Sequence, residues 1–168
     1  MSSSNSERVL SQFSNRQLIP EVVRLLEEGH TVTLRLKGFS MRPFLEDNRD
    51  KALLTKSVAP QVGDPVLAEV ASQHYVLHRI VAIKGDMVTL RGDGNLGVEH
   101  CRLADVHGAV VGFYRKGRTT LERTDGWKWR TYSWVWMHLL PFRKYILAIY
   151  RRLILKEWGS PGCNRGEA

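Results

Sequence analysis

Apolar and polar residues alternate along the middle of this chain, from about residue 31 to residue 122. A period of two is typical of strands with one buried face, and clusters of Gly, Pro and Asp divide the region into short segments. Successive short strands with tight turns favour a mainly β domain with antiparallel, partly barrel-like pairing. The strands predicted in this way are 31–37, 51–56, 65–71, 74–83, 86–91, 108–114 and 118–122.

Helical patterns flank this β region on both sides. Before it, apolar residues recur at i, i+4, i+7 and i+8, which predicts a helix over about residues 16–28, capped by Asn15 and ended by Gly29. This stripe is expected to pack on the sheet and consists of Leu18, Val22, Leu25 and Leu26. After it, residues 132–140 are apolar almost all round, and residues 143–157 have one apolar and one basic face.

The composition predicts one globular domain with flanking segments. Residues 15–125 form the expected domain and residues 126–158 a basic, Trp-rich helical segment, while residues 1–14 are expected to be disordered and 159–168 a loose tail. No apolar run in the first 30 residues has the length of a signal peptide, and no 18 apolar residues follow one another without interruption. Cys101 and Cys163 have neither disulfide-framework nor metal-ligand spacing, which favours a reducing, cytoplasmic location without metal or cofactor.

Positive charge is concentrated at the C-terminal end. The formal net charge of the whole chain is +8, and residues 126–158 hold seven Lys or Arg against one acid, Glu157, so this segment carries +6. All five tryptophans lie there too. Such a segment can dock on an anionic membrane surface, because Trp prefers the interface and basic residues are attracted to acidic headgroups. Alternatively it folds back onto the β domain; nucleic acid is less favoured, since the tryptophans accompany Ile, Leu and Val.

A hydroxyl group lies between the first predicted strand and a Pro-marked turn, at Ser40. Three further motifs follow it along the β region, and together the four resemble the signal peptidase I and SOS-repressor superfamily of serine peptidases. With His78 in the third motif, the chain is most similar to the endoplasmic-reticulum and archaeal-type signal peptidases, without their N-terminal membrane anchor. The motifs are Ser40-Met41-Arg42-Pro43, Gly63-Asp64-Pro65-Val66, His78-Arg79-Ile80 and Gly92-Asp93-Gly94-Asn95.

The resemblance implies a fold of coiled, mixed β-sheets and a catalytic centre with Ser40 as nucleophile and His78 as base. A serine hydroxyl is a poor nucleophile at neutral pH and needs a base within hydrogen-bonding reach. A histidine base works best when an acid orients its other ring nitrogen. The family pattern offers Asp93, which is favoured here, and Glu99; a turn-capping role for Asp93 and a dyad without either acid stay open.

The same resemblance places the oxyanion and substrate contacts around the serine loop. The backbone N–H of Ser40 is the implied oxyanion donor, and Gly38 offers no side-chain donor where some bacterial relatives carry a hydroxyl. Gly38 would instead let the backbone turn closely past a substrate. The other implied contacts are Phe39, Met41 and Pro43.

Two functions follow from these observations. The first is a serine endopeptidase that removes a leader or propeptide from a protein substrate. The alternative is a regulatory or binding module of the same fold that works through the Trp-rich segment.

Alternation along 74–83 also predicts that Val76, His78, Ile80 and Ala82 share one face of their strand, with Ile83 on the other.

Overall fold

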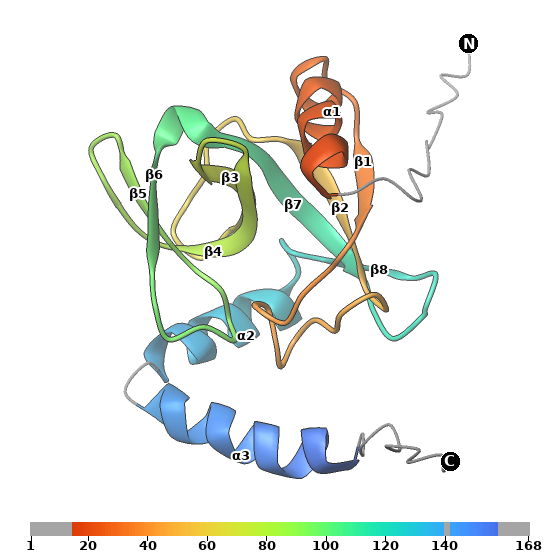
Figure 1. Cartoon of the computed structure of the whole chain (residues 1–168), viewed down its shortest axis with the longest axis vertical. Helices are drawn as coiled ribbons and strands as arrows, with labels where there is room; N and C mark the ends of the chain where they lie inside the picture. Colours follow the sequence, from red (N-terminus) through yellow and green to blue (C-terminus); the bar gives the residue numbers. More distant parts are fainter. Residues whose placement is uncertain (1–14, 140–141, 158–168) are drawn as a thin grey trace, which may run out of the picture.

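A single antiparallel sheet of eight strands is the centre of the molecule (Figure 1). The computed structural model describes residues 15–139 and 142–157. The strands follow the order β1-β2-β7-β3-β4-β5-β6, and β8 pairs with β7. The strands are β1 (Val32–Arg35), β2 (Lys51–Lys56), β3 (Pro65–Ala71), β4 (His74–Lys84), β5 (Met87–Arg91), β6 (Glu99–Arg102), β7 (Val106–Tyr114) and β8 (Leu121–Arg123).

The predicted mainly β architecture is confirmed, with two corrections. All strand pairs among the described residues are antiparallel, so the mixed pairing implied by the family resemblance is wrong for this part of the chain. Each of the seven predicted strands is present, but β6 is an additional strand that the alternation did not predict. Only Cys101 is buried in β6, so a four-residue strand on the surface leaves almost no hydrophobic pattern.

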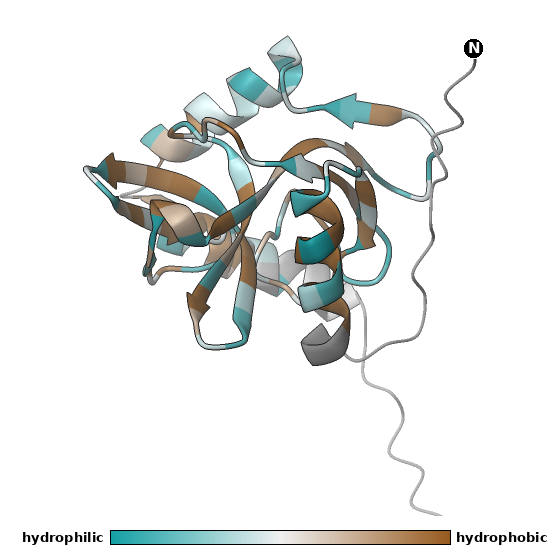
Figure 2. Cartoon of the chain, turned by 90° about the horizontal axis from the view of Figure 1, so that it is seen from above, coloured by the Kyte–Doolittle hydropathy of each residue, from teal (hydrophilic) through white to brown (hydrophobic). Residues whose placement is uncertain are grey.

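Helix α1 (Asn15–Glu27) covers one side of the sheet and begins within one residue of the predicted position. The predicted stripe of Leu18, Val22, Leu25 and Leu26 is buried, together with residues of β1, β2 and β7. Gly29 ends the helix with a positive φ of 86°, a conformation that glycine adopts without steric cost. Figure 2 shows hydrophobic stretches along the strands and polar residues in the connecting turns.

A second hydrophobic cluster is formed by buried side chains of the strands β3 to β7 on the other face of the sheet. The pairing of β4 with β5 shifts register between Ile80 and Ala82, which is a β-bulge or irregularity. Ile80 and Ile83 therefore both pack in this cluster, and the predicted assignment of Ile83 to the opposite face is wrong. An extra residue in a strand reverses the alternation beyond it, and no local pattern marks its position.

Two helices, α2 (Trp127–His138) and α3 (Arg143–Glu157), follow the sheet. Trp129 of α2 is buried and packs against Phe44 and Phe113, with ring centroids 4.6 and 5.0 Å away. Trp136 is buried as well, so at least the inner face of α2 folds back onto the β domain, as one of the two alternatives predicted. Trp158 and the predicted tails, 1–14 and 159–168, lie outside the described residues. Within the described chain, no helix has the length and apolar character needed to cross a membrane.

Candidate active site

Ser40 lies in the loop that joins β1 to β2. Gly38, two residues earlier, has a φ of +91°, and its N–H donates to Asp47 Oδ1 over 2.7 Å. A Cβ atom at this position would meet nothing within 4 Å. Glycine is therefore favoured here by the backbone conformation, and the expected passage of a substrate close to Gly38 stays a prediction.

His78 lies in the buried part of β4 and is 3% exposed. Its Nδ1 is 2.7 Å from Oε2 of Glu99, the first residue of β6. Since a carboxylate only accepts hydrogen bonds, Nδ1 carries the proton and Nε2 of the neutral ring is left with its lone pair. Burial lowers the pKa of His78 below its ordinary value, although the charge and hydrogen bond of Glu99 act in the opposite direction. The ring is therefore neutral at pH 7 and available as a base.

The turn at residues 92–95, between β5 and β6, brings the serine loop and His78 together. The N–H of Gly94 donates to the backbone oxygen of Ser40 over 2.7 Å. A methyl group placed on Gly92 would lie 2.4 Å from that same oxygen and 2.9 Å from His78 Nε2. Both atoms thus adjoin Gly92, so the free nitrogen of the imidazole lies near the backbone of the serine loop. Only a residue without a side chain fits between them.

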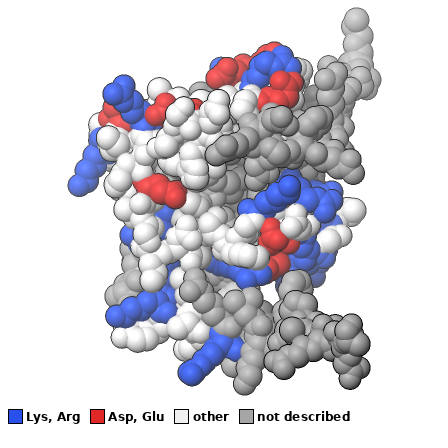
Figure 3. All heavy atoms as spheres, in the orientation of Figure 1, with Lys and Arg blue, Asp and Glu red and all other residues white. Residues whose placement is uncertain are grey.

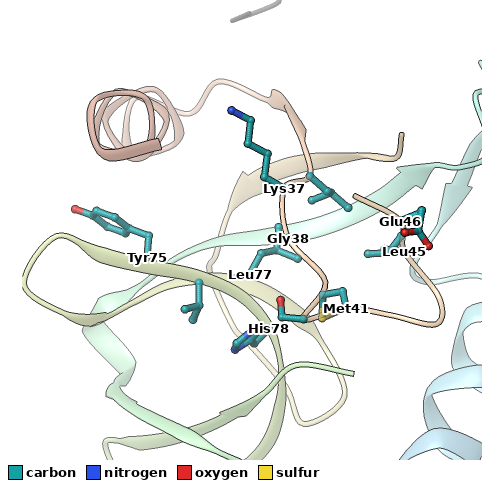
Figure 4. A pocket seen from close by; sticks show the side chains of 11 residues that line it. Lys37, Gly38, Met41, Leu45, Glu46, Tyr75, Leu77 and His78 are labelled. Carbon is teal, nitrogen blue, oxygen red and sulfur yellow. The ribbon is translucent and has the colours of Figure 1, made fainter. Parts of the chain in front are cut away.

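A cavity of about 140 Å³ opens beside these residues (Figure 4). Of the predicted site residues, Gly38, Ser40, Met41 and His78 line it, and Phe39 and Pro43 do not. Met41 is buried in the hydrophobic core, while the ring of Phe39 is exposed and carries the guanidinium of Arg42 at 4.0 Å. In the described structure no hydrogen bond joins the Ser40 hydroxyl to His78. Such contacts often form only when substrate is bound.

Asp93 does not orient His78, so the preference for it over Glu99 is corrected. Its buried carboxylate receives two parallel hydrogen bonds from Arg79, Nε to Oδ1 at 2.9 Å and Nη2 to Oδ2 at 2.7 Å. Arg79 is the neighbour of His78 on β4, and successive residues of a strand point to opposite faces. Asp93 thus pairs with Arg79 on the face of β4 opposite to His78, whereas Glu99 contacts the imidazole.

The C-terminal helices complete this buried ion pair. Tyr132 Oη donates to Asp93 Oδ2 over 3.2 Å, and Ser133 Oγ accepts from Arg79 Nη1 over 2.5 Å. Arg143 of α3 is also buried, with Nη2 3.6 Å from Asp93 Oδ1. Burial lowers the pKa of Arg143, whereas for Arg79 the hydrogen bond and charge of Asp93 outweigh burial and raise the pKa.

Sequence reasoning did not predict the role of Arg79. The available signal was a charged residue in the centre of a largely apolar strand, since arginine is almost never fully buried unless it is paired. Among the described residues, no three His, Cys, Asp or Glu side chains gather as a metal site would need. A hydroxyl and a neutral imidazole line one cavity, and a carboxylate binds the other ring nitrogen, a set of groups that suits acyl transfer.

No family model and no curated protein matches the chain.

Replacing the two acids separately will distinguish their roles. Asp93→Asn leaves the buried Arg79 without its counter-charge and should lower the free energy of unfolding by about 3–5 kcal/mol. Glu99→Gln should cost under about 1 kcal/mol, because Glu99 is half-exposed and the amide oxygen can still accept from Nδ1. It should also lower the pKa of His78 further, since the Glu99 charge raises that pKa. Urea denaturation and an NMR titration of the His78 ring measure the two effects. An unchanged His78 titration in Glu99→Gln would contradict this assignment.

Proposed function

We propose that this protein is a serine endopeptidase that removes a leader or propeptide by acyl-enzyme hydrolysis. The observation that carries the proposal is the orientation of His78. Glu99 accepts from Nδ1, and Nε2 adjoins the backbone of Ser40 across Gly92. A hydrolase of this type needs an imidazole fixed in that tautomer beside a serine hydroxyl. The resemblance of the four sequence motifs to signal-peptidase-like enzymes agrees with this function but does not depend on the same observation.

The proposed reaction has two halves. Ser40 Oγ attacks the substrate carbonyl carbon while His78 Nε2 takes the hydroxyl proton, and the imidazolium then protonates the leaving amine as the peptide bond breaks. In the second half, water loses a proton to Nε2, attacks the acyl-enzyme ester and releases Ser40. Glu99 stabilises the imidazolium in both halves through Nδ1.

The oxyanion of each tetrahedral intermediate requires a hydrogen-bond donor. We assign this role to the backbone N–H of Ser40, for which no acceptor is found among the described residues. Gly38 has no side-chain donor to add, and its own N–H is bound by Asp47. The proposed oxyanion site is therefore made of backbone alone. Loss of one such donor costs other serine hydrolases about 2.7–4 kcal/mol of transition-state stabilisation.

Two unpaired strand edges favour an extended peptide as substrate. Among the described residues, β1 is the first strand of the sheet and has β2 as its one strand partner. β4 pairs with β5 only from Arg79 onward, so residues 74–78 lack a partner on that side within the described structure. Residues 75–78 of β4 and the segment directly after β1, residues 36–38, line the cavity beside Ser40. A peptide that adds as a strand here gains main-chain hydrogen bonds and brings one carbonyl to the serine.

The Trp-rich helices carry a second proposal, which is peripheral docking on an anionic membrane surface. Their inner face is used for packing, but Trp127 and Trp134 are 73% and 63% exposed on α2. Exposed Lys and Arg side chains accompany them, and no acid occurs from residue 126 to 156. In Figure 3 Lys and Arg side chains appear in the lowest part of the molecule, where α3 lies in Figure 1. This combination is complementary to acidic headgroups.

Ser40→Ala should abolish peptide cleavage and labelling by a fluorophosphonate probe while the protein keeps its stability. The hydroxyl makes no hydrogen bond in the described structure, so its loss removes the nucleophile and little else. Ser57→Ala is the matched control, since the Ser57 hydroxyl is buried without a partner and lies outside the cavity. Mass spectrometry of the labelled peptide and melting curves of both variants measure the outcome. Label on the Ser40→Ala protein, or cleavage at the parental rate, excludes Ser40 as nucleophile.

The rate should depend on pH through His78. The base must be unprotonated, and burial lowers the pKa of His78 from 6.5, so kcat/KM should stay level at neutral pH and fall only below that value. A lysine base would place the limb in the alkaline range. Glu99→Gln should move the limb to still lower pH, because the carboxylate raises the His78 pKa. A rate that rises steadily up to pH 9 argues against a histidine base.

Vesicle flotation tests the membrane proposal with the full chain. The protein should float with vesicles of phosphatidylserine and phosphatidylcholine, remain behind with phosphatidylcholine alone, and be released by high salt. A Trp127→Ser, Trp134→Ser double variant should lose most of the binding. The matched control is Val58→Ser, which removes an apolar side chain that is 88% exposed elsewhere. Equal flotation with neutral vesicles, or of the double variant, contradicts the proposal.

A further inference from the structure

A second cavity continues the candidate active site. Its volume is about 570 Å³, and it shares four lining residues with the smaller cavity beside Ser40, namely Leu36, Lys37, Tyr75 and Leu77. Figure 4 shows Lys37 extending from the segment after β1 and Tyr75 from β4. The two cavities therefore form one groove between the unpaired edges of β1 and β4, which we name the β1–β4 groove.

The charged side chains that line the larger part of this groove are basic. Arg35 and Lys37 are among its lining residues and are exposed, and His74 adds an exposed imidazole. Its described lining contains no carboxylate, and Ser72 and Gln73 add polar groups. Arg35 gives one N–H to the backbone oxygen of Asn48 over 3.0 Å and keeps the rest of its guanidinium for other partners. Lys37 has no ion pair within the described residues.

Among the described residues, no carboxylate pairs with Arg35 or Lys37. Glu69 lies beside the groove without lining it, and its Oε1 accepts from the Gln73 N–H over 2.7 Å. It also interacts with the Tyr75 hydroxyl, whose pKa is raised first by burial and then by this carboxylate. Glu46 lines the smaller cavity, but its carboxylate pairs with Arg42. The groove thus presents positive potential to anything that lies in it.

We infer that the β1–β4 groove selects peptides with Asp or Glu close to the scissile bond, and that Lys37 and Arg35 are its specificity-determining residues. The inference rests on the proposed peptidase function. An extended peptide between the two edges carries alternate side chains toward opposite sides. Those directed at Lys37 and Arg35 are favoured when acidic, whereas a basic side chain there meets two like charges. Such opposition between like charges at an interface is strongly unfavourable.

A peptide library with one position fixed at a time, as Asp, Gln or Lys, tests the inference with the full-length protein. At one or two positions on one side of the bond, the wild-type protein should cleave the Asp peptides roughly tenfold faster than the Lys peptides, and added salt should shrink the difference. Lys37→Glu should reverse the preference at one of these positions, and Lys37→Gln should remove it. Lys84→Glu, at the far end of β4, is the matched charge-reversal control and should leave the preference unchanged.

Binding to the Ser40→Ala protein, followed by fluorescence anisotropy of labelled peptides from the same library, separates this inference from the proposed function. Cleavage without a preference for acids, or a preference that Lys37→Glu does not alter, overturns the groove assignment and leaves the peptidase standing. Binding of Asp peptides that Lys37→Glu weakens, with no cleavage by the wild-type protein, keeps the groove and overturns the peptidase. Absence of both binding and cleavage overturns both.

Discussion

The buried ion pair between Arg79 and Asp93 holds the candidate site together. Both side chains are almost completely withdrawn from water, which is costly unless every polar atom finds a partner. Arg79 follows His78 directly on β4, and Asp93 follows Gly92 in the turn at residues 92–95. The pair therefore ties the strand that carries the imidazole to the turn that contacts Ser40. The geometry of the candidate site therefore depends on a charge pair that takes no part in the proposed chemistry.

The same pair makes the C-terminal helices part of the domain. Ser133, Tyr132 and Arg143 supply polar contacts to it, and the rings of Trp129 and Tyr132 lie 4.8 and 5.6 Å from the Arg79 guanidinium carbon. The guanidinium is thereby covered by aromatic faces, to which cations are attracted. A segment that differs sharply from the rest of the chain in composition thus divides its residues between two uses. One face of the segment packs on the Arg79–Asp93 ion pair, and the other face stays exposed.

Local sequence patterns predicted most helices and strands correctly. They did not predict the short strand β6, the register shift in β4 or which acid contacts His78. The strands β2 and β3 and helix α3 have the predicted bounds, because turn residues or Pro stand beside them and their apolar periods are regular. β6 escaped prediction because it contributes one buried residue, and the irregularity after Ile80 has no local signature. The choice between Asp93 and Glu99 could not be made from spacing, since it depends on which face of β4 each acid reaches. Arg79 follows His78 on β4, so its side chain lies on the opposite face of the strand. Asp93 pairs with Arg79 there and is therefore directed away from His78.

The unpaired edges of β1 and β4 have a consequence for how copies of this protein behave toward one another. An exposed strand edge is a template for pairing with any other exposed edge, and natural proteins often protect it with lysine or similar charges. Arg35, Lys37 and His74 lie along these edges. Two identical molecules that approached edge to edge would bring like charges together, which opposes self-association through the groove. The basic residues proposed to select acidic peptides would therefore also oppose edge-to-edge pairing between two copies of the protein.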